Sequence, residues 1–204
     1  VGASAAVTAI TGDGVVSLRG LAADSDFSGV DAALDVTAEV NATVDVSANL
    51  TLNTVDTFNV DEGVTLSIQV SQITGDTLSG LGTVVLTDGG MFDGTFDVAR
   101  VEVASGETLT ISAAKADAQV IAGQAASASA TGGSVIITNL DGADAYDLRA
   151  ITAGAAGAGA VGSVTAFIGS NTLLNAGTYL GSVAITLGDT FSLDLTASQA
   201  TGRS

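Results

Sequence analysis

The stretch Leu34-Asp-Val-Thr-Ala-Glu-Val-Asn-Ala-Thr-Val-Asp-Val-Ser-Ala-Asn-Leu-Thr-Leu-Asn53 decides the fold class of this chain. Every even position in it is apolar and every odd position is polar. A period of two is typical of a β-strand with one buried and one solvated face, whereas a helix would spread these residues around its circumference. A straight strand of this length would far exceed the usual five or six residues. We therefore expect an all-β chain in which this segment bends at a corner.

Self-comparison of the sequence indicates internal repeats. Val60–Ile68 matches Val103–Ile111 at an offset of 43 residues, and both read as strand, Gly turn, strand. A third copy is Ile185–Leu193, and the segment that follows it, Ser198–Gly202, echoes Ser71–Gly75. A repeat that goes unrecognised leads to the wrong fold, so the fold prediction has to account for this match. It predicts a repeating unit of roughly 40 residues that ends in a short polar turn.

A second shared element links the beginning of the chain to its later part. Gly14–Leu21 resembles Gly133–Leu140, and Asp26–Val30 resembles Asp147–Ile151. In the second copy this element follows the unit around Gly106.

We expect residues 1–204 to form a single β-repeat body. Leu195–Ser204 reads as the front half of a unit whose back half resembles Val1–Leu21. We therefore hypothesise that the chain is one period of a longer tandem array, or one subunit of a head-to-tail fibre. The segment 150–162 is rich in Gly and Ala, and is either a flexible linker or a tightly packed region where only small residues fit.

The predicted architecture is a parallel β-solenoid, in which coils stack and bury a continuous core. Short strands, Gly turns, small aliphatic residues and the lack of Pro and Trp favour it. The alternative is a β-sandwich with strand exchange between subunits, which the long alternating run at Leu34–Asn53 would suit.

Composition excludes several classes of function. The chain has no His and no Cys, so it cannot hold a Ser-His-Asp triad, a Cys nucleophile, a His/Cys zinc site or a disulfide. Its net charge of -17 argues against nucleic acid and anionic membranes as partners, because both require a basic surface. No apolar run reaches the ~18 residues of a spanning helix, so we expect no membrane insertion.

We also expect no catalysis. Asp35, Glu39 and Asp45 fall on one polar strand face, where two carboxylates could in principle serve glycoside hydrolysis. Sugar enzymes normally add aromatic platforms and cationic partners, and this chain has no Trp and five scattered Lys and Arg residues. A solvated strand face explains the three carboxylates.

At Val103–Ala116 and Ser134–Gly142 the sequence resembles the repeats of very large secreted bacterial surface proteins. These include S-layer proteins, RTX-type adhesins and autotransporter-like β-solenoids. The resemblance implies a scaffold that is secreted or displayed on the cell surface. The tandem Gly-Gly-x-Gly-x-Asp signature of RTX repeats is absent, and its nearest echoes, Gly75–Gly80 and Asp88–Gly94, are single and imperfect.

Calcium is the only cofactor that the sequence suggests, because it accepts six to eight oxygen ligands in irregular geometry. The candidate ligands form two groups, Asp88, Asp93 and Asp97 around a Gly-rich turn, and Asp141, Asp144 and Asp147. The competing interpretation is that Asp favours turns through its own side-chain hydrogen bonds and keeps a surface soluble.

Together these features predict a non-catalytic structural module of an extracellular or cell-surface bacterial assembly. A surface fibre, an S-layer or an adhesin stalk would fit, with copies that associate end to end into a homopolymer, fibre or lattice. The alternative is a calcium- or carbohydrate-binding adhesin module.

Overall fold

The computed structural model describes residues 9–128, 130–157 and 159–201. It is an all-β parallel β-solenoid, and the described helical segments are four single turns of three or four residues. Its strands stack in parallel, which confirms the predicted solenoid and excludes the β-sandwich, whose sheets are antiparallel. The chain divides into two compact units, residues up to Glu102 and residues from Val103 onward, and each is described by itself.

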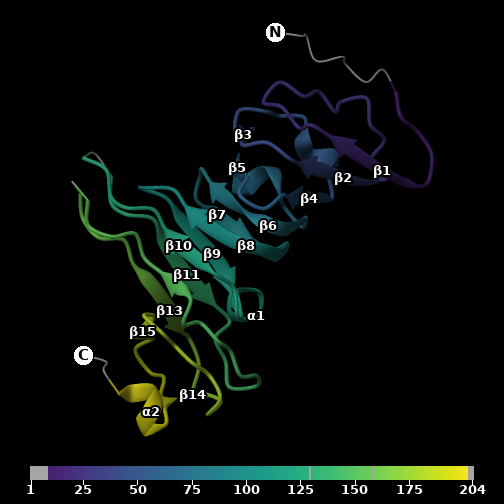
Figure 1. The fold of residues 1–204 in the computed structure, drawn as a ribbon. Coiled ribbons are helices and arrows are strands. Elements are labelled where there is room, and N and C mark those ends of the chain that lie inside the picture. Colours follow the sequence, from purple (N-terminus) through teal and green to yellow (C-terminus); the bar gives the residue numbers. More distant parts are fainter. Residues whose placement is uncertain (1–8, 129, 158, 202–204) are drawn as a thin grey trace. The chain divides into compact units, whose positions relative to one another are not determined.

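Unit 1 is a stack of coils, in which each coil places its strand beside the strand of the previous coil. Its elements are β1 (Val15–Arg19), β2 (Asp35–Val40), β3 (Val44–Asp45), η1 (Leu52–Thr54), β4 (Thr57–Val60), β5 (Thr65–Ile68), η2 (Val70–Gln72), β6 (Thr77–Leu86), β7 (Gly90–Phe92) and β8 (Thr95–Val103). β1, β2, β4 and β6 pair in this order, with Val15 opposite Asp35 and Thr57 opposite Thr77 (Figure 1). A coil of unit 1 is therefore 20 residues long at these strands.

The coil is about half the repeat expected from sequence. β6 lies between β4 and β8, so the matching segments that begin at the ends of β4 and β8 are two coils apart. Both enter a corner at a glycine in the left-handed region, Gly63 with φ +75° and Gly106 with φ +88°. The 43-residue match thus reflects one corner geometry that occurs in both segments, and the predicted strand, Gly turn, strand pattern is confirmed.

The segment 34–53 bends at a corner between β2 and β3, as predicted, but its second half abandons the period of two. Beyond β3 the buried side chains recur at every third position, as Val46, Asn49, Leu52 and Val55. The cause is a pair of tight turns, in which Asn49 N–H donates to the Val46 carbonyl (2.8 Å) and Val55 N–H donates to the Leu52 carbonyl (2.9 Å).

Ala48 and Leu50 show the consequence of this change of period. The alternation placed both in the core, and this prediction is wrong, because both are exposed, Leu50 to 86%. Asn49 is buried in their place.

Side chains at paired positions form the core of unit 1. Ala38 lies opposite Phe58, and Phe58 lies opposite Leu78, and all three are fully buried. A small, a large and an intermediate side chain follow one another along the stack, so the core is filled by complementary sizes rather than by a repeated residue.

Two side-chain amides of unit 1 donate hydrogen bonds to backbone carbonyls of the previous coil. The Asn49 amide donates to the carbonyl of Ser25 (2.6 Å), and the Gln72 amide donates to the carbonyls of Val46 (3.0 Å) and Asn49. Gln72 also accepts the Gln69 N–H (2.7 Å), which caps η2. Carbonyls that point into a corner are in this way satisfied from the next coil.

Unit 2 is built on the same plan, with coils of 26, 29 and 19 residues between successive strands of its sheet. Its elements are β9 (Thr108–Ser112), α1 (Ala113–Ala116), β10 (Ile121–Gly123), β11 (Ser134–Thr138), β12 (Ile151–Thr152), β13 (Val164–Ile168), β14 (Thr172–Leu173), β15 (Ala184–Leu187), β16 (Leu193–Asp194) and α2 (Ala197–Ala200). β9, β11, β13 and β15 lie side by side in parallel (Figure 1). Ile111, Ile137, Ala166 and Ile185 are consecutive partners along the inner face of this sheet.

Both predicted similarities within the chain correspond to common local structure. Gln199 in α2 repeats the role of Gln72, because it accepts the Thr196 N–H (2.9 Å) and donates to the Asn175 carbonyl (2.7 Å) of the preceding coil. The strands β1 and β11 are each followed by a residue in the left-handed region, Gly20 with φ +74° and Asn139 with φ +53°.

In the Gly- and Ala-rich segment 150–162, the glycines at 154, 157, 159 and 162 lie close to the backbone of other segments. Gly154 N–H donates to the Gly133 carbonyl and Gly162 N–H donates to the Gly154 carbonyl, both at 2.9 Å. A Cβ at Gly154 would overlap the carbonyl oxygen of Gln124. The residues at the two chain ends on which the tandem hypothesis depends, 1–8 and 202–204, lie outside the described residues.

Candidate functional site

Two carboxylates of the first predicted cluster form hydrogen bonds between neighbouring segments of unit 1. Asp88 accepts the Val70 N–H (2.5 Å) and Asp93 accepts the Gly75 N–H (2.8 Å). Asp97 is exposed on β8. Asp88 and Asp93 thus serve as acceptors for backbone N–H groups at corners of the solenoid.

The second predicted cluster lies in unit 2, on the loop between β11 and β12. Asp147 forms an ion pair with Arg149 (2.5 Å), and this hydrogen-bonded guanidinium lowers the pKa of Asp147 to about 2. Asp141 accepts the Tyr146 hydroxyl (3.2 Å), and burial followed by the charge of Asp141 raises the pKa of that tyrosine. Asp144 is exposed in a bend.

These arrangements do not gather the carboxylates of either cluster around a common point. Within residues 9–128, 130–157 and 159–201, no three Asp or Glu side chains are placed to hold a metal ion. Calcium binding by either cluster stays a prediction.

A different carboxylate, which the sequence interpretation missed, is perturbed by its surroundings. Asp76 precedes β6, as Asp56 precedes β4, and the Asp56 carbonyl accepts the Thr77 N–H (2.8 Å), so the two aspartates are neighbours in adjacent coils. Burial raises the pKa of Asp76 to about 7, and the negative charges of Asp56 and Asp93 add to the shift. The recurrence of Asp-Thr 20 residues apart was the available signal.

Asp76→Asn is expected to reduce the dependence of stability on pH. The pKa of Asp76 rises from the ordinary 3.8 of an aspartate to about 7 on folding, so the folded chain keeps a proton that the unfolded chain loses. The stability contributed by this proton is full below about pH 4 and is lost as the pH rises through about 7. We expect the free energy of unfolding of the variant to exceed that of the parent by about 1–2 kcal/mol at pH 8, because solvent screens part of the effect, and to equal it at pH 4.

Urea unfolding of the parent chain, Asp76→Asn and the exposed control Asp61→Asn at pH 4 and pH 8 measures this difference. The control should keep the parent's pH dependence. An equal pH dependence in the parent and in Asp76→Asn would contradict the assignment.

The coil that contains β15 leaves core positions of unit 2 uncovered. Leu187 lies opposite Ile168, which is 2% exposed, yet Leu187 is 43% exposed. Phe191, just beyond β15, is also exposed. Among the described strands β15 is the outermost of its sheet, so one of its edges carries N–H and C=O groups with no strand partner. An apolar layer and a free strand edge thus coincide at this end of unit 2.

The comparisons with known proteins assign no relative to the chain. No family model matches it, and the comparisons with curated proteins and with solved structures give no significant match. Within the described residues, the helices are too short to cross a membrane.

Proposed function

We propose that this chain is a non-catalytic structural module of an extracellular bacterial assembly, such as a surface fibre, an S-layer or an adhesin stalk, whose copies stack end to end. The observation that carries the proposal is the uncovered coil at β15. Ile168 is buried because β15 covers it, and Leu187 is exposed because none of the described residues forms a further coil over β15. A coil from a second copy would extend both the sheet and the apolar layer.

The distribution of charge supports stacking along one axis. The net charge of -17 disfavours lateral contact between copies at low ionic strength. Leu187 and Phe191 expose apolar side chains at this end, so their burial would favour contact there. Charge and burial together favour linear over lateral growth.

Sedimentation velocity over a range of protein concentrations, with negative-stain electron microscopy of the same samples, tests the proposal. We expect linear oligomers or filaments, and we expect Leu187→Lys to weaken association about tenfold or more, because a charge would then be buried at the joint. Leu50→Lys is the matched control, since it makes the same change at an exposed leucine of unit 1.

Monomers of the parent chain at every concentration would overturn the proposal. Equal weakening by Leu187→Lys and Leu50→Lys would also overturn it, because the effect would then follow net charge rather than the β15 end. Thermal unfolding of both variants identifies any loss that comes from misfolding.

A further inference from the structure

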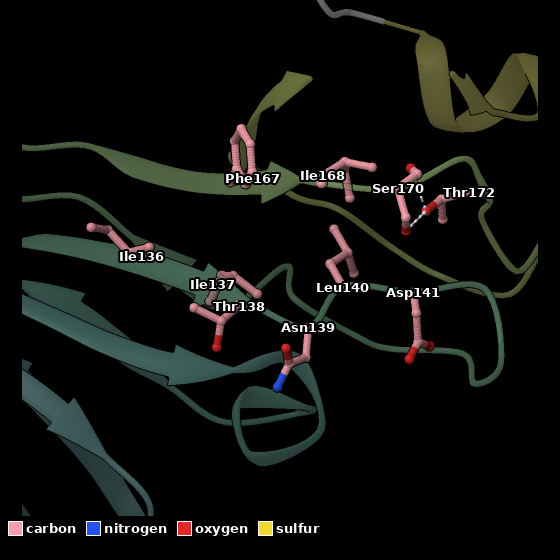
Figure 2. Close-up of a pocket in the computed structure, with 11 residues that line it drawn as sticks. Ile136, Ile137, Thr138, Asn139, Leu140, Asp141, Phe167, Ile168, Ser170 and Thr172 are labelled. Carbon is pink, nitrogen blue, oxygen red and sulfur yellow. Dashed lines mark hydrogen bonds between the residues drawn. The ribbon is translucent and has the colours of Figure 1, made fainter. Parts of the chain in front are cut away.

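The coil that contains β1 repeats the backbone conformation of the coil that contains β11. The two strands are both five residues long and coincide at an offset of 119 residues. Each is followed by a residue in the left-handed region, Gly20 in one coil and Asn139 in the other. A buried leucine comes next, Leu21 or Leu140, and Figure 2 shows Asn139 and Leu140 just beyond the end of β11. The two strands thus end in the same local structure.

The likeness of the two coils extends to their next corner. In both coils an aspartate accepts the N–H group two residues later, Asp26 at 3.0 Å and Asp147 at 3.1 Å. Four residues after the aspartate, an apolar residue donates its N–H to the carbonyl three residues earlier, Val30 at 2.9 Å and Ile151 at 3.2 Å. Both apolar residues also pair in parallel with an isoleucine earlier in the chain. The coil of β1 therefore has the form of a coil from within a stack.

β11 is covered by β9, but no described strand covers the corresponding side of β1. β9 places Leu109 and Ile111 opposite two inner side chains of β11, and all four are fully buried. The corresponding inner residues of β1 are Val16 and Leu18, which are partly exposed. Among the described strands β1 is the outermost of its sheet, so one of its edges has N–H and C=O groups without a strand partner. A strand like β9 would complete this side of β1.

β15 has the sequence features of such a strand. Its residues Ala184–Leu187 follow the pattern of Thr108–Ile111 in β9, with aliphatic residues at the second and fourth positions and threonine at the third. β15 also belongs to the same sheet as β9 and β11. When β15 is aligned with β9, the register of β9 and β11 sets the exposed Leu187 opposite Leu18 of a second copy. A second copy can therefore supply the strand that β15 lacks.

The charges at the ends of these two strands are complementary. Arg19 ends β1 and is exposed, and within the part of the chain that the structure describes it forms no ion pair. In the β9–β11 register, Arg19 of the second copy falls opposite Gly188, next to the exposed Asp189. Residues 180–194 contain no Lys or Arg, so pairing of two β15 strands would bring no cation to this turn. Charge thus favours β1 over a second β15 as the partner strand.

We propose that β15 of one copy pairs in parallel with β1 of the next copy, in the register of β9 and β11. Ile185 then lies opposite Val16 and Leu187 opposite Leu18, so the partly exposed side chains of the two ends cover one another. β1 would have β15 on one edge and β2 on the other, as β11 has β9 and β13. The inference rests on the proposed end-to-end association and specifies the two strands that form the joint. Because the two surfaces differ, each added copy leaves one of each free, and growth continues.

Disulfide trapping tests the joint, and the chain has no Cys that would interfere. The proposed register places two pairs of exposed residues opposite each other, Ser17 with Thr186 and Val15 with Ala184. Paired Cα atoms would lie about 4.8 Å apart, which a disulfide can span. Ser17→Cys is mixed with Thr186→Cys, and Val15→Cys with Ala184→Cys, and each mixture is oxidised at a concentration at which the parent associates. We expect the mixed disulfide as the main product, identified by mass spectrometry of the linked peptides.

The swapped mixtures of the same four proteins are the matched controls. Ser17→Cys with Ala184→Cys, or Val15→Cys with Thr186→Cys, is displaced by two residues, which separates the Cα atoms by about 8 Å, beyond the reach of a disulfide. We expect at least fivefold less mixed disulfide from these mixtures. Circular dichroism of each reduced protein verifies folding, and either matched pair alone gives the result.

Three outcomes would overturn the proposed joint. They are equal cross-linking in matched and swapped mixtures, homodimers of Thr186→Cys as the main product, and oligomers of the parent chain without a mixed disulfide in either matched mixture. In each of these cases the copies still associate, so the proposed function stands and only the choice of strands is wrong. Monomers at every concentration would overturn both proposals.

Discussion

Replacing Gly154 by alanine is expected to destabilise the protein by about 3 kcal/mol or more, or to prevent folding of unit 2. The added Cβ would overlap the Gln124 carbonyl oxygen and would lie 2.6 Å from the Gly133 nitrogen. Both obstacles are backbone atoms, so no side-chain rotation can relieve them. The strands around Gly154 would have to separate, and the hydrogen bond from Gly154 N–H to the Gly133 carbonyl would be lost with them.

Gly14→Ala is the matched control. A Cβ at Gly14 would meet no atom within 4 Å, and Gly14 is not among the glycines with positive φ. We expect its free energy of unfolding to stay within about 0.5 kcal/mol of the parent value. Urea unfolding followed by circular dichroism compares the three proteins. A Gly154→Ala midpoint equal to that of the parent would show that segment 150–162 is not packed as described.

Phe58→Ala is expected to cost about 3–5 kcal/mol, the range for truncating a buried aromatic side chain. Phe58 is fully buried between Ala38 of the previous coil and Leu78 of the next. Ala38 has no side chain that could swing into the space, so the cavity would persist.

Two further variants separate this effect from a general loss of apolar surface. Phe58→Leu keeps most of the volume and should cost about 1–1.5 kcal/mol. Leu81→Ala, at a leucine that is 68% exposed, should change the unfolding midpoint little. A similar midpoint for Phe58→Ala and Leu81→Ala in the same urea titration would contradict the proposed core.

The period of two predicted strand β2 correctly, because alternating burial follows from the geometry of a strand and depends only on neighbouring residues. The alternation from Leu34 to Val40 requires a strand with one buried face, and β2 has that pattern. The glycines of the matching segments marked corners correctly at Gly63 and Gly106.

The alternation already fails at the corner, where Ala42 is exposed, and beyond Val46 tight turns replace the strand. A turn of three residues buries every third side chain, and Ala48, Leu50 and Leu52 retained an apolar pattern that the backbone no longer followed. The burial of Asn49 could not be read from its neighbours, since it depends on the Ser25 carbonyl of another coil.

The coil length and the candidate site could not be predicted, because both depend on contacts between residues that are far apart in the sequence. The 20-residue period is hidden because core partners differ in size, as Ala38, Phe58 and Leu78 do. Asp88 and Asp93 each accept an N–H group 18 residues earlier in the chain, so their role depends on a contact that their sequence neighbours do not reveal.

The 20-residue coil of unit 1 also stores a long stretch of chain within a short rise along the stack. Fully extended, 20 residues span about 70 Å, whereas one coil adds only about 4.8 Å to the stack. A pulled module could release its coils one at a time, as the hydrogen bonds donated by the Asn49 and Gln72 side-chain amides broke in turn. Each released coil would lengthen more than tenfold while the remaining coils kept their shape. A surface structure assembled from such modules would yield to a sudden load by extension before it broke.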